Sequence, residues 1–290
     1  MNLDDVARGP LLYRDNFLEC YRTQPIHGEP AELWVLPEQF RDPTFVAMFE
    51  DAATFLAHYP LASLPKPIAS SPTALLVTAP PWVALKHVIA GAPQGVPLGL
   101  ALTFVHALAR DLAQLPRPVV LRSIAPNSLA ISTAGQPRLL DTTIARFAGR
   151  QTQTSPGIIK GQIRYMSPEL AGGRSLAGTS DVFALALVTF ELLTGVAAFE
   201  RRSTELDTLL QIVQGRAPAL RSHRSDLPAA MYRLLDHMLA TQPHERADAG
   251  HVVRMIQHEL AGELWSGDRM FDEVRRIAPA AVDAALLYGY

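Results

Sequence analysis

The residues best suited to chemistry lie in the second half of this 290-residue chain, around a polar segment that ends in Ser167-Pro168-Glu169. Twelve residues after Glu169, Asp181 begins a stretch with helical spacing that is apolar on nearly every face. A helix that is hydrophobic all round must be buried, so we expect Asp181 at the edge of a core. A buried carboxylate is costly unless it accepts hydrogen bonds. The pattern therefore predicts that Asp181 holds another loop in place.

The segment between Asp141 and Gly161 carries hydroxyl groups that could be phosphorylated, and Arg122 could receive such a phosphate. These candidate phosphorylation sites are Thr152, Thr154 and Ser155. The alternative is a solvated polar loop, with Arg122 satisfied by internal contacts. Three histidines further on recur every seven residues, whereas histidines that bind a metal from one helix are usually four apart, so this set predicts a solvated helix face.

Composition narrows the class of protein. With 48% hydrophobic and 19% charged residues, the chain has an ordinary globular composition with room for a sizeable core. A net charge of −2 argues against nucleic-acid binding. The single cysteine, Cys20, excludes an intrachain disulfide and a multi-cysteine metal site. No apolar run is long enough to span a bilayer, and residues 1–10 do not form a signal peptide, so we expect a cytoplasmic protein.

The elements that must position these residues differ between the two halves of the chain. The first half contains strand-like runs and one helical run, at 17–23, 31–37, 43–58 (helical) and 73–79. Pro80-Pro81 then marks a hinge. Beyond it an amphipathic helix is expected over 97–114, a hairpin around Thr133–Gln136, and helices from Asp181 to about Leu260. A small strand-rich half followed by a large helical half is an α+β arrangement.

This order of elements, with four local sequences, resembles the protein kinase family. Ser167-Pro168-Glu169 stands where the family has its Ala-Pro-Glu motif. Asp181 corresponds to the buried aspartate that caps the family's central helix, and Arg246 to the late arginine that pairs with that glutamate. Residues 121–128 match the catalytic loop in frame and in their arginine and proline. The resemblance spans roughly residues 10–260 and implies a two-lobed protein kinase-like fold. The residues that it implies to be structural are Arg122, Glu169, Asp181 and Arg246.

The same comparison places other residue types where the family carries its chemistry. Phosphoryl transfer depends on positioning and on charge neutralisation. Ser123 replaces the aspartate that accepts the substrate proton, Ala125 replaces the lysine two residues on, and Ser128 replaces the asparagine that binds Mg²⁺. Asp141 is the one metal-ligand candidate that the resemblance retains, and a lone carboxylate is a poor Mg²⁺ site.

The strand-rich half departs further from the family. Residues 31–34 align with the family's Val-Ala-Ile-Lys, which places Trp34 at the phosphate-binding lysine, and Ala52 stands where that lysine's glutamate partner belongs. No glycine-rich phosphate loop precedes them. Lys86 ends a near match to the lysine motif, but only 34 residues separate it from Leu121, too few for the elements that must intervene.

These departures predict a pseudokinase of the bacterial Ser/Thr type that is not an enzyme and takes no cofactor, Mg-ATP included. Its expected role is that of a scaffold or an allosteric regulator that binds protein partners, such as an active kinase or a signalling complex. Two alternatives remain open: a degenerate Ser/Thr kinase with weak ATP binding and slow phosphotransfer, which uses Asp141 and a relocated cation, and a small-molecule sensor with a remodelled cleft around Trp34. Nucleic-acid partners and membrane insertion are not expected.

The predicted domain organisation has three parts. Residues 1–80 form a degenerate small lobe, 81–262 a large lobe, and 263–290 a helical extension beyond the family domain. The extension carries an apolar stripe at helical spacing that either packs back on the large lobe or docks a partner. The stripe comprises Met270, Phe271, Val274 and Ile277.

Overall fold

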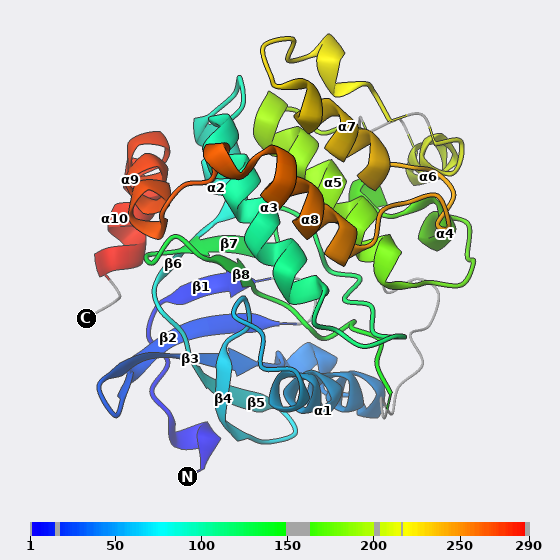
Figure 1. The fold of residues 1–290 in the computed structure, drawn as a ribbon. Helices are drawn as coiled ribbons and strands as arrows, with labels where there is room; N and C mark the ends of the chain where they lie inside the picture. Colours follow the sequence, from blue (N-terminus) through cyan, green and yellow to red (C-terminus); the bar gives the residue numbers. More distant parts are fainter. Residues whose placement is uncertain (1, 15–17, 149–162, 200–203, 216, 288–290) are drawn as a thin grey trace.

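A computed structural model describes residues 2–14, 18–148, 163–199, 204–215 and 217–287 (Figure 1). A five-stranded sheet with one helix forms a small lobe, and most of the helices gather in a larger lobe above it. The predicted two-lobed α+β architecture is therefore confirmed.

The small lobe is an antiparallel sheet packed on one helix, α1 (Pro43–His58). Its strand order is β1-β2-β3-β5-β4. The strands are β1 (Leu11–Arg14), β2 (Glu19–Ile26), β3 (Glu29–Val35), β4 (Lys66–Ser70) and β5 (Ala74–Thr78). Asp42 starts α1, because its carboxylate accepts hydrogen bonds from the amides of the first helical turn.

The turn between β2 and β3 sets the register on which the candidate site depends. His27 and Gly28 both adopt positive φ, of 51° and 81°, which suits a tight connection between two antiparallel strands. The register then pairs Cys20 with Trp34 and Arg22 with Glu32. Because paired residues project to the same face and side chains alternate along a strand, all four side chains share one face of the sheet.

A second, three-stranded sheet lies between the five-stranded sheet and the helices (Figure 1). It contains β6 (Trp82–Ala84), β7 (Leu129–Ser132) and β8 (Pro137–Leu139), with β7 in the middle. The turn after β7 contains Gly135 at φ 69°, where a Cβ atom would also collide with the backbone of Gly267. The second sheet thus brings residues of the large lobe under the small lobe.

Ser63, between α1 and β4, ties the two lobes together through its backbone. Its amide donates to Asp111 Oδ2 over 2.6 Å, and its carbonyl accepts from the amide of Leu139 over 2.9 Å. Asp111 belongs to α3 (Leu98–Leu112) and Leu139 to β8, so both partners lie in the large lobe. The lobes are therefore joined on this side by specific hydrogen bonds.

The large lobe is built around α5 (Gly178–Thr194), which is buried from Ser180 to Thr194. It packs against α3 (Leu98–Leu112), α7 (Ala229–Met238) and α8 (Ala249–Glu259). The remaining helices before residue 260 are α2 (Leu85–Gly91), α4 (Pro168–Ala171) and α6 (Glu205–Val213). Short 3₁₀ helices cover Leu3–Asp5, Glu38–Phe40, Ile163–Tyr165, Leu220–Ser222 and Ala261–Glu263.

The last two helices pack back on the rest of the molecule. The helix α9 (Gly267–Ile277) contacts α2 and α3, and α10 (Pro279–Leu287) contacts β6 (Figure 1). Met270, Val274 and Val282 are fully buried in these contacts. In the part of the chain that the structure describes, no helix combines the length and the hydropathy needed to cross a membrane.

Candidate functional site

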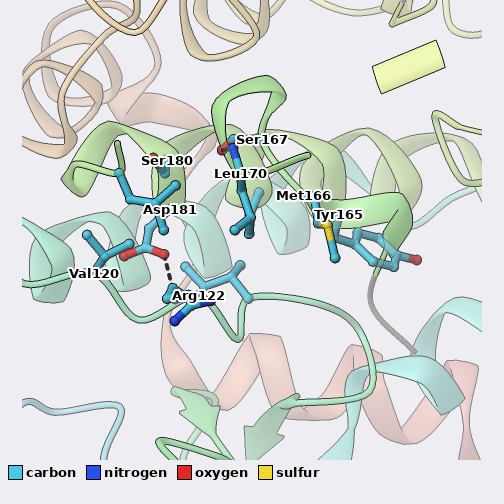
Figure 2. A pocket seen from close by; sticks show the side chains of 11 residues that line it. Val120, Arg122, Tyr165, Met166, Ser167, Leu170, Ser180 and Asp181 are labelled. Atoms are coloured by element: carbon cyan, nitrogen blue, oxygen red, sulfur yellow. Dashed lines mark hydrogen bonds between the residues drawn. The ribbon is translucent and has the colours of Figure 1, made fainter. Parts of the chain in front are cut away.

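Asp181 anchors the loop that precedes β7. Its carboxylate accepts a hydrogen bond from the Leu121 amide at 2.7 Å and another from the Arg122 amide at 2.9 Å, and Figure 2 shows it pointing at the Arg122 backbone. Arg122 itself adopts positive φ, at 66°. Burial raises the pKa of Asp181 to about 6, against the lowering effect of the two amides. The acid therefore holds a strained loop in position from inside the core.

Glu169 and Arg246 form a buried, bidentate ion pair. The Arg246 Nη1 and Nη2 atoms lie 2.7 and 3.0 Å from the two carboxylate oxygens of Glu169. Ser180 Oγ donates a third hydrogen bond to Glu169, at 2.6 Å. Burial opposes ionisation of Glu169, but the hydrogen bonds from Arg246 and Ser180 prevail and lower its pKa. The pair fixes the start of α4 against α5 and the segment before α8.

A small cavity lies between this anchored loop and the segment that leads into α4 (Figure 2). Arg122, Tyr165, Ser167 and Asp181 line it together with apolar side chains. Its volume of about 20 Å³ is room for a single water molecule and far too little for a nucleotide or a peptide side chain. Tyr165 points away from Asp181 in Figure 2, and its hydroxyl donates to Glu191 Oε2 at 2.5 Å. The cavity belongs to the structural support of the loop.

The hydroxyl groups of Ser123 and Ser128, in the anchored loop, donate hydrogen bonds to backbone carbonyls. Ser123 Oγ donates to the carbonyl of Asp141 at 2.9 Å, and Ser128 Oγ donates to the carbonyls of Ser123 and Ala125. Ala125 is buried beside them. The Asp141 carboxylate accepts hydrogen bonds from the amide and the hydroxyl of Thr143, both at 2.7 Å. These contacts join the loop to the end of β8 and give the two serines a structural task.

A set of polar and aromatic side chains occupies the space between the two sheets, and we refer to it as the Glu32 cluster. Glu32 is fully buried and accepts hydrogen bonds from two indoles: Trp82 Nε1 at 2.6 Å and Trp34 Nε1 at 3.4 Å. Arg138 Nη2 donates to it at 3.4 Å. The cluster comprises Cys20, Arg22, Glu32, Trp34, Trp82 and Arg138. One carboxylate from β3 thus joins the small lobe to β6 and β8.

Charge in the Glu32 cluster is unbalanced. Arg22 Nη1 lies 3.8 Å from Glu32 Oε1, so two buried guanidiniums face one carboxylate. Arg22 Nε and Nη1 and Arg138 Nε have no hydrogen-bond partner among the described residues. Burial raises the pKa of the Cys20 thiol, which stays neutral, and lowers the pKa of Arg138. The cluster therefore carries an excess positive charge out of contact with water.

Of the two predicted site residues in the small lobe, one belongs to this cluster and the other does not. Trp34 is one of its members, whereas Ala52 is buried on α1 next to Asp51, a buried acid that the sequence reading passed over. Sequence reading also missed Glu32 and Arg22. Arg22 lies five residues before His27 and Glu32 lies four residues after Gly28, and an irregularity in the register between Thr23 and Ile26 brings the two opposite each other.

The remaining predicted positions are not members of the Glu32 cluster. Lys86 is exposed on α2. The candidate phosphorylation sites Thr152, Thr154 and Ser155 lie outside the described residues.

The structure has the features that the sequence resemblance implied for a protein kinase: two lobes, a loop anchored by a buried aspartate, and the Glu169–Arg246 pair. Comparison with known proteins identifies the same family. The model of the protein kinase domain matches residues 100–259, more than half of the chain. The chain belongs to the protein kinase family. The matched range begins within α3, so it covers the large lobe and leaves out the small one.

Bacterial kinases are among the most similar relatives. The tyrosine-protein kinase MasK of Myxococcus xanthus is 35% identical over 145 residues, 50% of this chain and 22% of the relative. The serine/threonine-protein kinase PknK of Mycobacterium bovis is 36% identical over 140 residues, 47% of this chain and 12% of the relative. PrkC of Bacillus subtilis is 30% identical over 128 residues, 44% of this chain and 20% of the relative. The similarity spans less than a quarter of the length of each of these three relatives.

Two predictions from the sequence are contradicted by these findings. The prediction that the chain is not an enzyme conflicts with relatives that are named as serine/threonine and tyrosine kinases. The prediction that it takes no cofactor conflicts with membership of a family that transfers phosphate from Mg-ATP. Both predictions gave more weight to single replaced side chains, such as Trp34 and Ser123, than to the similarity of the whole large lobe.

The described cleft, in the arrangement seen here, does not fit Mg-ATP. Glu32, Trp34, Trp82 and Arg138 fill the space between the two sheets, where the family holds its nucleotide. No group of three or more histidine, cysteine or acidic side chains that could hold a metal ion occurs within the described ranges. Nucleotide entry would require the Glu32 cluster to separate.

Proposed function

We propose that this chain is a Ser/Thr protein kinase domain held in a closed state, with slow phosphotransfer that requires the cleft to open. The observation that carries the proposal is the Glu32 carboxylate, which accepts hydrogen bonds from β6 and β8 and so closes the space between the lobes. Similarity to bacterial serine/threonine kinases supports the reaction class. Asp141, at the end of β8, is the acid retained beside the cleft, and Arg138 is the relocated cation.

The test measures phosphate transfer from radiolabelled ATP to a generic protein substrate and to the chain itself. Wild type should incorporate label slowly, and Asp141→Ala should reduce incorporation to background. Glu32→Gln should increase it several-fold, because an amide binds the two guanidiniums and indoles less strongly than a carboxylate. Glu29→Ala, an exposed acid on the same strand, should match wild type. Background signals in all four proteins, each shown by circular dichroism to be folded, would exclude the kinase proposal.

A second candidate function is that of a regulator that binds a protein partner, and this role is compatible with catalysis. It is favoured by an exposed apolar stripe on α6: Leu206, Leu210 and Val213 are 64%, 49% and 39% exposed. These residues lie at positions i, i+4 and i+7, so they share one face of the helix. A protein partner, such as an active kinase, is expected to dock on this stripe, because an amphipathic helix face is a common docking element.

Reconstitution tests this role. A partner captured with the intact chain should bind again as a purified protein, and Leu210→Glu should weaken that complex at least tenfold. Leu287→Glu changes a more exposed leucine, on α10, and should leave the affinity unchanged. Equal affinity for the Leu210 variant and wild type would remove α6 from the proposal. Truncation at Ala261 tests whether the last two helices also contribute.

A further inference from the structure

A larger cavity, of about 240 Å³, lies between the small lobe and the end of α10. Its walls come from residues 7–10 before β1, residues 22–25 of β2, Pro30 of β3 and Leu287 of α10. Much of the lining is apolar, with three prolines among the wall residues. Within the described part of the chain, the lining contains two arginines, Arg8 and Arg22, and no carboxylate.

Arg22 is the unusual member of this lining, because it is only 6% exposed. Its Nε and Nη1 atoms are closed to water and have no hydrogen-bond partner among the described residues, and Arg22 pairs with Glu32 only at 3.8 Å, from Nη1 to Oε1. A guanidinium so far removed from water is costly unless its donors are satisfied. The cavity wall therefore includes a residue whose positive charge is only loosely compensated.

Neighbouring groups do not neutralise Arg22. Glu32 is shared with Arg138 and also accepts from the two indoles of Trp34 and Trp82. Cys20 is a neutral thiol, since burial raises its pKa. Arg8 lies at the exposed rim, with its guanidinium 5.5 Å from the centre of the Tyr21 ring. Both arginines of the lining thus add positive charge to a mostly apolar cavity.

We propose that this cavity is a binding site for a small organic anion, whose oxyanion pairs with Arg22 and whose apolar body packs against the prolines and Leu287. Phosphate monoesters and carboxylates share the required chemistry, because the oxyanion of either is attracted to a guanidinium and accepts its hydrogen bonds. The size and the mostly apolar lining are those of a small-molecule pocket with few polar groups. Asp141 and Trp34 do not line this cavity, but Arg22 also belongs to the Glu32 cluster, so a bound anion and Glu32 share one guanidinium. The proposal does not depend on phosphotransfer by this chain.

Isothermal titration calorimetry at constant ionic strength tests the site with three probes: phenyl phosphate, phenylacetate and benzyl alcohol. At least one of the two anions should bind at millimolar concentration or below, and the neutral alcohol should not. Tighter binding of phenyl phosphate identifies a phosphate monoester as the ligand class, and tighter binding of phenylacetate identifies a carboxylate. Failure of both anions to bind, or equal binding of the alcohol, would overturn the proposal.

Variants locate the bound anion. Arg22→Gln should weaken binding about tenfold or more, because it removes a charge-assisted hydrogen bond, and Arg8→Gln should weaken it by a smaller factor. Ala7→Trp should abolish binding by filling the cavity while Arg22 remains. Arg276→Gln, on the surface of α9, should bind like wild type, and so should Asp141→Ala, which acts on the kinase cleft alone.

Unchanged affinity in both Arg22→Gln and Ala7→Trp would place the anion elsewhere and refute the assignment. If Arg22→Gln does not fold, Ala7→Trp decides the question alone, because Ala7 is an exposed residue ahead of β1. A folded Ala7→Trp that still binds the anion as wild type does would then be sufficient to reject the site.

Discussion

Two buried ion clusters, one in the large lobe and one between the lobes, hold their charges in different ways. Arg246 makes two short hydrogen bonds to Glu169, and its remaining donors reach the carbonyls of Thr179, Ala240 and Thr241. In the Glu32 cluster the two ion-pair distances are 3.4 and 3.8 Å, and three guanidinium nitrogens have no partner among the described residues. We call Glu169–Arg246 the saturated pair, because every nitrogen of the Arg246 guanidinium is hydrogen-bonded. Such a pair specifies one geometry, whereas the loosely paired Glu32 cluster can exchange partners. We therefore expect the Glu169–Arg246 pair to be a fixed support of the large lobe and the Glu32 cluster to be a contact between the lobes that can rearrange.

The largest expected effect comes from the saturated pair. Arg246→Met should lower the free energy of unfolding by about 3–5 kcal/mol, because Glu169 is then left buried without its counter-charge. Urea denaturation measures the loss, and Arg233→Met, at an exposed ion pair, is the control that should cost less than about 1 kcal/mol. A loss below about 1 kcal/mol for Arg246→Met would contradict the description of this pair as the fixed support.

Asp181 provides a pH-dependent comparison with the saturated pair. Its folded pKa of about 6 is raised from 3.8, so the folded state binds this proton more tightly than the unfolded state does. The contribution of Asp181 to stability is therefore most favourable below about pH 4 and declines as the pH rises toward 6. Wild type should lose about 2–3 kcal/mol relative to Asp181→Asn across that window.

Urea denaturation of both proteins at several pH values measures the difference, in which the other titrating groups largely cancel. A difference that is flat with pH, or one that grows in favour of wild type, would mean that the amides of Leu121 and Arg122 outweigh burial.

The loosely paired cluster should respond less than the saturated pair. Arg22→Met removes the excess positive charge and leaves Glu32 with Arg138, so the free energy of unfolding should change by less than about 1 kcal/mol, in either direction. The measurement is the same urea denaturation, which compares Arg22 and Arg246 directly. A loss as large as that for Arg246→Met would show that the two clusters are equally committed and would weaken the proposal of a cleft that opens.

The smallest effect is expected on the surface. Leu210→Ser on α6 should change the free energy of unfolding by less than about 0.5 kcal/mol, because nearly half of its side chain surface is already exposed. Thermal denaturation measures this, and Leu185→Ser in the buried α5 is the control that should lower the melting temperature markedly. A marked loss of stability at Leu210 would indicate that α6 is part of the packing rather than a free surface.

The supporting residues of the large lobe could be predicted from the sequence because each lies in a short, recognisable sequence pattern. Asp181 lies in the first turn of a helix that is apolar on nearly every face, and Glu169 lies in a short motif whose arginine partner is known from the family resemblance. The Glu32 cluster could not be predicted in this way, because its contacts join β2, β3, β6 and β8, which are separated by up to more than a hundred residues in the sequence. Alignment of β3 pointed to Trp34 as a replaced lysine and passed over Glu32, two residues earlier, whose role depends on tertiary contacts.

The chain contains three tryptophans, and two of them, Trp34 and Trp82, donate to the same Glu32 carboxylate from opposite sides of the cleft. The third, Trp265, lies beneath the Arg269 guanidinium ahead of α9. Indole emission shifts when a neighbouring charge or water is gained or lost. Intrinsic fluorescence excited at the indole band is thus a built-in optical reporter of whether the lobes are together or apart, with no label to attach.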